Sequence, residues 1–180
     1  MTRHDTFTIS RHLDAPPDRV FAAFADTAIR RRWSKLPGSG ASYEHDFRVG
    51  GGEIARSTFT APDTAPERLE YRSRYIDIAD ARRIVYAYDA VVEGELRWTS
   101  LVTVRLAAES AGTRLDWTEQ VTFLRYTGAG DTDLAHLRGG TTLRLNGVDA
   151  ALRPAGAAWR GAPERLTGPV PRGTGGGTLR

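Results

Sequence analysis

Glu119 stands out in this sequence because it is a carboxylate on the expected apolar face of a strand. In residues 113–123, every second side chain shares one side of the strand with Glu119. The other members of that side are Leu115, Trp117, Val121 and Phe123. An isolated charge on an apolar face is unfavourable, so Glu119 must be paired, solvated or protonated. We expect its partner to be Arg48 or a tyrosine hydroxyl.

Glu119 could do acid–base chemistry if a closed pocket held it protonated beside a tyrosine. Tyr75 and Tyr86 lie on the core-facing sides of two further expected strands, and such a pair could act on a carbonyl compound. Asp46 is a second candidate carboxylate for this role. In the alternative interpretation, Glu119 forms an ion pair near a strand end or lies in water at a cavity mouth. No residue is therefore assigned a catalytic role.

Three tryptophans could line a pocket for a flat apolar ligand, because aromatic walls suit such molecules. They are Trp33, Trp98 and Trp117, and in the alternative interpretation they fill the space under a curved sheet. The candidate ligand-binding residues are Trp33, Arg48, Tyr75, Tyr86, Trp98, Trp117 and Glu119.

The elements that must position these residues follow from the hydrophobic periodicity. Residues 5–14 alternate as a strand, and two short helices follow, the second restarting at Asp26-Thr27 and ending near Trp33. Six further strands are expected at 42–48, 52–60, 68–77, 83–92, 95–107 and 113–123. A long helix is expected over residues 131–152, where apolar residues recur every three or four positions.

The faces of some elements are ambiguous. In strand 42–48, the inward set is either Tyr43, His45 and Phe47, or Glu44, Asp46 and Arg48. The three arginines of Ile29-Arg-Arg-Arg32 are interpreted as the solvated side of a short helix. The triplet Gly50-Gly51-Gly52 lacks the Gly-Lys-Ser/Thr ending of a phosphate loop, so it predicts a hairpin turn.

Composition narrows the class of protein. The chain has 180 residues, no cysteine and a formal net charge of +3. Residues 153–180 contain five arginines and one glutamate, so the positive charge lies in this Gly/Pro/Arg-rich tail and residues 1–152 are close to neutral. We expect one domain over residues 1–152 and a disordered tail over 153–180.

The same composition argues against several partners. A near-neutral domain does not favour nucleic acid, and no apolar run is long enough for a membrane span. Four scattered histidines make a metal site improbable, and no motif indicates a cofactor. We expect a cytoplasmic protein whose partner is a small hydrophobic molecule, with a homodimer as a further possibility.

Five motifs together resemble a known superfamily. They are Leu13-Asp-Ala-Pro-Pro-Asp-Arg-Val-Phe21, Arg32-Trp33, Asp46-Phe-Arg-Val-Gly-Gly51, Arg83-Ile-Val-Tyr86 and Gly112-Thr-Arg-Leu115. They are similar to the SRPBCC (START-like, Bet v 1-like) superfamily, and within it to the bacterial branch named after the C-terminal domain of the heat-shock-protein-90 ATPase activator. The resemblance implies an α+β helix-grip fold, with a curved seven-stranded antiparallel sheet around a long C-terminal helix. The chaperone activators carry an additional N-terminal domain that this sequence lacks, so their cochaperone role is not expected.

Three functions remain open at this point. The first is binding of a small hydrophobic or aromatic ligand in an internal cavity. The second is a polyketide cyclase-like or related acid–base enzyme that acts on a carbonyl compound in the same cavity. The third is an interaction module without a pocket.

Overall fold

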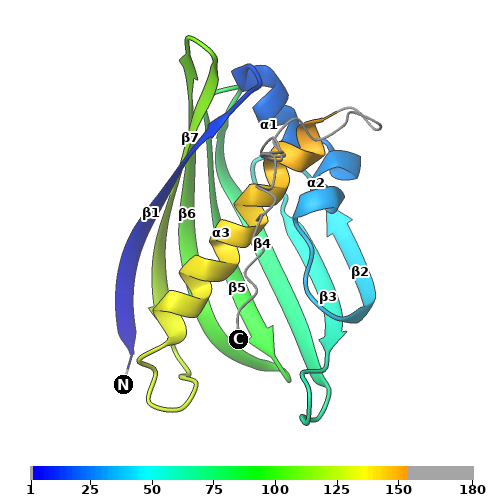
Figure 1. The fold of residues 1–180 in the computed structure, drawn as a ribbon. Helices are drawn as coiled ribbons and strands as arrows, with labels where there is room; N and C mark the ends of the chain where they lie inside the picture. Colours follow the sequence, from blue (N-terminus) through cyan, green and yellow to red (C-terminus); the bar gives the residue numbers. More distant parts are fainter. Residues whose placement is uncertain (1, 154–180) are drawn as a thin grey trace, which may run out of the picture.

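A curved antiparallel sheet wraps around a long helix in the computed structural model, which describes residues 2–153 (Figure 1). The strands are β1 (Arg3–Leu13), β2 (Ser39–His45), β3 (Glu53–Phe59), β4 (Glu67–Ala79), β5 (Arg83–Val92), β6 (Glu95–Glu109) and β7 (Gly112–Phe123). The helices are α1 (Pro17–Ala25), α2 (Thr27–Trp33) and α3 (Asp133–Leu152). This is the helix-grip architecture that the sequence predicts.

The sheet has the order β1-β7-β6-β5-β4-β3-β2, and every neighbouring pair is antiparallel. Strands β2 to β7 follow one another as hairpins, whereas β1 crosses over to pair with β7. In that pair Arg3 lies opposite Phe123 and Leu13 lies opposite Thr113. The first and last strands of the chain are therefore neighbours in one continuous sheet.

The turn between β5 and β6 shows why short connections fit this sheet. Val92 and Glu95 lie opposite each other, and only Glu93 and Gly94 connect them. Both residues have positive φ, 52° and 80°. Two-residue hairpin turns of this kind match the right-handed twist of the strands, and glycine adopts the required conformation easily.

The β2–β3 connection begins earlier than the sequence predicts. The expected strand 42–48 ends at His45, because the backbone N–H of Asp46 donates to the Gly52 carbonyl at 2.8 Å and closes a turn. Gly52 must be glycine here, since a Cβ would lie 1.9 Å from the carbonyl oxygen of Ser73. The Gly50-Gly51-Gly52 triplet is thus part of a turn, as expected.

Helix α2 begins where the sequence indicates, and α3 begins at Asp133, two residues after the expected start. Asp26 caps α2, because its Oδ1 accepts the backbone N–H groups of Ala28 at 2.7 Å and Ile29 at 3.0 Å. Helix α3 buries a stripe against α1, α2 and β1. The buried residues of α3 are Leu137, Thr141, Leu145, Val148 and Ala151. The helix pair α1–α2 therefore covers one end of α3.

The tail expected to be disordered lies outside the described residues, apart from Arg153. The boundary between a domain at 1–152 and this tail stays a prediction. Among the helices of residues 2–153, none is long and apolar enough to cross a membrane.

Candidate functional site

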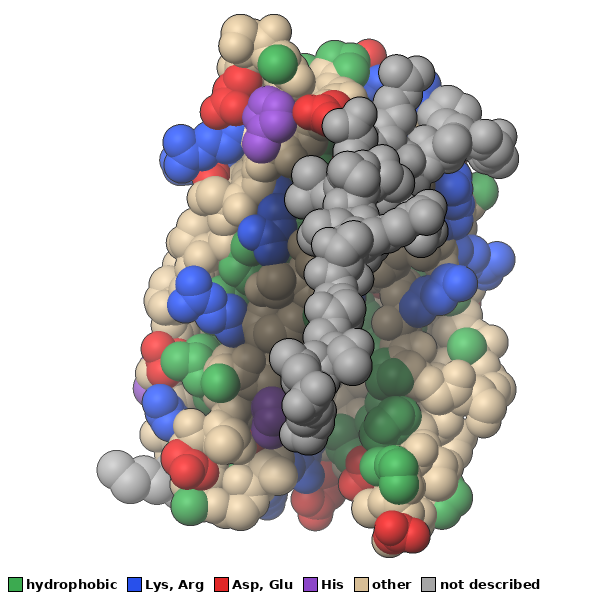
Figure 2. All heavy atoms as spheres, viewed as in Figure 1, with side chains coloured by type: hydrophobic (Ala, Val, Ile, Leu, Met, Phe, Trp, Pro, Cys, Tyr) green, Lys and Arg blue, Asp and Glu red, His purple; other side chains and the backbone are tan. Residues whose placement is uncertain are grey.

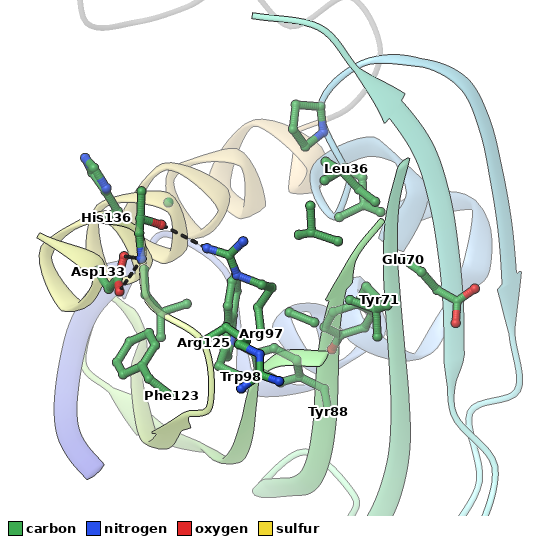
Figure 3. Close-up of a pocket in the computed structure, with 18 of the residues that line it drawn as sticks. Leu36, Glu70, Tyr71, Tyr88, Arg97, Trp98, Phe123, Arg125, Asp133 and His136 are labelled. Atoms are coloured by element: carbon green, nitrogen blue, oxygen red, sulfur yellow. Dashed lines mark hydrogen bonds between the residues drawn. The ribbon is translucent and has the colours of Figure 1, made fainter. Parts of the chain in front are cut away.

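A cavity of about 520 Å³ lies between the N-terminal half of α3 and strands β4 to β7. Figure 3 shows its aromatic lining, and Figure 2 shows hydrophobic side chains in a hollow beside α3, over β4 and β5. Its apolar wall includes Leu36, Tyr71, Tyr88, Trp98, Phe123 and Leu137. Leu36 comes from the connection between α2 and β2, and the others come from the inward positions of the strands and from the sheet-facing side of α3, so the curvature of the sheet creates the space that they line.

Glu119 lies directly behind this wall. Its side chain points into the interior of the sheet and is 0% exposed, which confirms the predicted face of β7. Oε1 accepts the Tyr88 hydroxyl at 2.5 Å and the Ser100 hydroxyl at 2.8 Å, and Oε2 accepts Trp117 Nε1 at 3.0 Å. Three hydrogen-bond donors thus stabilise the Glu119 carboxylate, which forms no ion pair with the described residues. Of the two partners expected from the sequence, the structure has the tyrosine hydroxyl and not the arginine.

Tyr88 separates Glu119 from the cavity. Its hydroxyl donates to Glu119 and accepts Trp98 Nε1 at 3.1 Å. Burial raises the pKa of Tyr88 far above its ordinary value, and the neighbouring Glu119 raises it further. The phenol is therefore neutral at pH 7, and its one proton is committed to Glu119. Towards the cavity, its oxygen can only accept a hydrogen bond.

The three tryptophans have different surroundings. Trp98 lines the cavity. Trp117 is buried and donates to Glu119, while Trp33 donates from Nε1 to the Ala23 carbonyl at 2.8 Å. The Trp33 ring packs edge-on against Phe24, with 5.0 Å between ring centroids. Trp33 and Trp117 therefore fill space in the core under the sheet, and only Trp98 of the three lines the cavity.

Tyr75 and Tyr86 lie in the core next to each other, and neither lines the cavity. Their ring centroids are 5.9 Å apart, and Tyr86 also meets Trp117 at 5.9 Å. The hydroxyl of Tyr75 is 3.0 Å from Nε2 of His45. The tyrosine that meets Glu119 is thus Tyr88, two residues along the strand from the expected Tyr86.

Arg48 and Asp46 lie on the β2–β3 turn, away from the cavity. Arg48 Nε is 2.8 Å from Asp46 Oδ2, and their side chains are 71% and 53% exposed. Because β2 ends at His45, the turn conformation and not strand alternation determines where these two side chains point. The inward set is the first alternative, in which Tyr43, His45 and Phe47 are half-buried. Pairing of Arg48 with Glu119 is therefore wrong.

A buried ion pair that the sequence reading missed joins α2 to β3. Arg30 is 3% exposed and Glu53 is 1% exposed. Arg30 Nε donates to Oε1 at 2.7 Å and Nη2 donates to Oε2 at 2.9 Å, while the Tyr43 hydroxyl donates to Oε1 at 2.5 Å. The guanidinium lies 4.2 Å from the centre of the Trp33 ring. Interpreting all three arginines of α2 as solvated was wrong for Arg30, because this residue faces the sheet.

The charge state of this pair follows from its contacts. Burial alone would raise the pKa of Glu53, but attraction to Arg30 outweighs burial and leaves the pKa below its ordinary value. The pair does not line the cavity. It fixes α2 on the sheet and has no surface towards a ligand.

Arg144 and Tyr71 are the second feature that sequence reasoning missed, and both line the cavity. Arg144 follows Leu137 and Gly140 at spacings of three and four residues, so a helical wheel of α3 places the three on one side. That spacing is the signal that could have identified Arg144. Within residues 2–153, no group of three or more histidine, aspartate or glutamate side chains is arranged to hold a metal ion.

Comparison with known proteins identifies the family. Residues 14–153 match the family described as Activator of Hsp90 ATPase homolog 1-like protein. An uncharacterized protein from Rhizobium leguminosarum is 36% identical, with 84% of this chain and 96% of that chain covered and a TM-score of 0.72. Mll3558 from Rhizobium loti is 38% identical, with 84% and 99% covered and a TM-score of 0.70.

A more distant structure has the same fold. Protein CV1439 from Chromobacterium violaceum is 27% identical over 83% of this chain and 99% of that chain, with a TM-score of 0.58. No curated protein matches the chain. Since the family match spans most of the sequence and includes the strands and helix that enclose the cavity, the chain belongs to the Activator of Hsp90 ATPase homolog 1-like family of the SRPBCC superfamily.

Proposed function

We propose that this protein binds a small hydrophobic or aromatic molecule in the cavity between α3 and β4 to β7. The observation that carries the proposal is an open space of about 520 Å³ with aromatic and aliphatic walls. Protein sites for small organic molecules are commonly about 300–1,000 Å³, mostly apolar and supplied with few polar groups. The alternative of an interaction module required a filled interior, which does not fit this space.

The rigid wall around Tyr88 supports binding of a flat ligand. The Tyr71 and Tyr88 rings lie 4.8 Å apart, and Trp98 is held by its hydrogen bond to the Tyr88 hydroxyl. Aromatic side chains fixed in this way lose little further conformational freedom when a ligand enters. The ligand's apolar surface would leave water at the same time, which supplies the main driving force.

A blocking substitution tests the proposal. Gly140 lines the cavity and Gly139 does not, and a Cβ at either position meets no atom within 4 Å. We expect Gly140→Phe to weaken binding of the neutral probe N-phenyl-1-naphthylamine by about tenfold or more, because the ring occupies ligand space. Gly139→Phe is the matched control and should bind as the unaltered protein does. The measurement is a fluorescence titration of the purified full chain.

The titration has a clear opposing result. If the probe does not bind, or if both phenylalanine variants bind it equally well, the cavity is not the binding site. Native mass spectrometry of the freshly purified protein provides an independent readout, since a retained ligand should be present with Gly139→Phe and absent with Gly140→Phe.

An acid–base enzyme acting on a carbonyl compound in this cavity is the second candidate. The observation that favours it is the 2.5 Å hydrogen bond between the Tyr88 hydroxyl and Glu119 at the cavity wall. Against it, Glu119 already accepts three hydrogen bonds, and Tyr88 has no second proton to offer a carbonyl. Proton transfer would require this arrangement to open, so binding is the better-supported function.

The two candidates differ in what happens to a bound molecule. A ligand recovered by native mass spectrometry should keep its mass on prolonged incubation with the protein if binding is the function. A change of mass that occurs with the unaltered protein and not with Tyr88→Phe would favour the enzyme.

A further inference from the structure

The charged side chains around the cavity are unbalanced. The cations are Lys35, Arg97, Arg125 and Arg144, and the carboxylates are Glu70 and Asp133. Both carboxylates are engaged elsewhere. Glu70 points away from the cavity in Figure 3 and pairs with Arg56 at 2.6 Å, and Asp133 accepts the Thr127 backbone N–H at 3.1 Å. Arg125 lies 3.9 Å from Glu95, whereas Lys35, Arg97 and Arg144 form no ion pair with the described residues.

Arg144 is the cation placed best for a ligand. It is half-buried, its Nη2 donates to Thr141 Oγ1 at 3.1 Å, and it forms no ion pair with the described residues. A guanidinium has five N–H donors, so most of its donors remain unused. Burial would lower the pKa of Arg144, but the electrostatic influence of Tyr88, Tyr86, Tyr71 and Glu119 outweighs burial and raises it. The side chain is charged at any physiological pH.

Tyr71 adds a second donor to the same wall. It is 8% exposed, and its hydroxyl has no hydrogen-bond partner among residues 2–153. Burial raises the pKa of Tyr71 well above its ordinary value, so the phenol keeps its proton. Unlike Tyr88, whose proton is committed to Glu119, Tyr71 can donate to a molecule in the cavity.

Building on the proposed ligand cavity, we propose that the ligand is an amphipathic monocarboxylate. Its carboxylate binds Arg144 and Tyr71, and its apolar body lies against Trp98, Phe123 and Leu137. A partly buried guanidinium that keeps several donors unused is matched by a planar carboxylate, which accepts two parallel hydrogen bonds. Lys35, Arg97 and Arg125 also line the cavity and favour arrival of an anion.

Calorimetric titration of the full chain with two matched pairs of probes tests this. The pairs are dodecanoate with dodecan-1-ol and 2-naphthoate with 2-naphthylmethanol, which differ in charge but little in apolar body. In at least one pair we expect the carboxylate to bind tighter than the alcohol by about tenfold or more, the range of a charge-assisted hydrogen bond in a partly buried site.

Substitutions on α3 identify the group responsible. Arg144→Gln should reduce carboxylate affinity to that of the alcohol and leave alcohol affinity within about twofold. Arg138→Gln is the matched control, because Arg138 is exposed on the same helix and does not line the cavity. Tyr71→Phe, which removes only a hydroxyl, should reduce the preference for the carboxylate in part.

The outcomes separate this inference from the proposed function. If the alcohols bind as tightly as the carboxylates, or if Arg144→Gln keeps the preference, the monocarboxylate inference is wrong while cavity binding stands. If no carboxylate or alcohol binds and N-phenyl-1-naphthylamine also fails to bind, the proposed function itself is overturned.

Discussion

Glu119 illustrates how a buried carboxylate can be stabilised without a cation in contact. Tyr88, Ser100 and Trp117 each donate one hydrogen bond to it, and all three are held by the surrounding strands. Hydrogen bonds to a charged group are stronger than those between neutral groups, and three of them offset much of the desolvation. The carboxylate in turn orients Tyr88 and, through it, Trp98 at the cavity wall.

Replacing Glu119 by glutamine should therefore reduce stability. The amide NH₂ cannot accept a hydrogen bond, so at least one of the three donors loses its acceptor. We expect Glu119→Gln to lower the free energy of unfolding by about 1–3 kcal/mol in urea titrations. Glu67→Gln, at the exposed start of β4, is the matched control and should change little. Equal stability of the two variants would contradict the structural role of Glu119.

At the residue level, strand alternation predicts a side chain's face but not its partner. Glu119 has the expected face because β7 is regular and most of its inward neighbours are apolar. Arg30 and Glu53 could not be paired from sequence, since they lie on a helix and on a strand whose contact depends on how α2 meets the sheet. Arg48 faces inward in only one of the two interpretations of strand 42–48, and the observed strand ends before reaching it.

Helix α3 combines a buried stripe with three glycines, which lower its intrinsic stability. Gly140 lines the cavity and its neighbour Gly139 does not, and a Cβ at either position would meet nothing within 4 Å. At Gly147, a Cβ would instead lie 3.1 Å from the Cβ of Trp33. The first two positions leave room beside the helix, whereas the third allows close approach of α2.

Alanine at these positions should thus have unequal effects. We expect Gly139→Ala to raise the free energy of unfolding by about 0.5–1 kcal/mol, from helix propensity alone. Gly147→Ala should give a smaller gain or a loss, because Trp33 must shift. Thermal and urea unfolding of both variants measure the difference, and a larger gain at Gly147 would contradict the tight packing of α2 on α3.

At the level of elements, most of the fold could be predicted from periodicity. The predicted strand 83–92 coincides with β5, and the other six predicted strands agree with the structure to within a few residues, because β-strand alternation repeats over long stretches here. The end of β2 was misplaced by three residues, since closure of the turn at Asp46 depends on a hydrogen bond to Gly52. The cavity itself could not be located, as it depends on the distance at which α3 stands from the sheet.

For the whole molecule, the half-buried His45 and the buried Glu53 make stability depend on pH. The pKa of His45 is lowered, first by burial, and that of Glu53 is lowered because attraction to Arg30 outweighs burial. In both cases the unfolded chain binds a proton more readily than the folded chain. Their stabilisation is therefore complete above the ordinary values of 6.5 and 4.5 and is lost as pH falls through the folded values.

We expect the midpoint of thermal unfolding to fall as pH is lowered below about 6.5, and His45→Gln to flatten that part of the curve. The contribution of His12 to stability depends on pH in the opposite direction. A hydrogen bond to Glu109 raises its pKa, so its stabilisation is present at low pH and is lost as pH rises. His12→Gln should make the fall steeper. If both variants followed the unaltered protein between pH 7.5 and 5.5, the assignment to these histidines would be wrong.

The pairing of β1 with β7 has a consequence for synthesis on the ribosome. Strand β1, with Phe7, Ile9 and Leu13 on its apolar side, precedes the other described strands and finds its neighbour only once residues 112–123 have been translated. Until then β1 is an unpaired apolar strand, and nascent chains with exposed strands of this kind are prone to aggregation. Closure of the sheet is thus a late event, and α3 emerges later still to cover it.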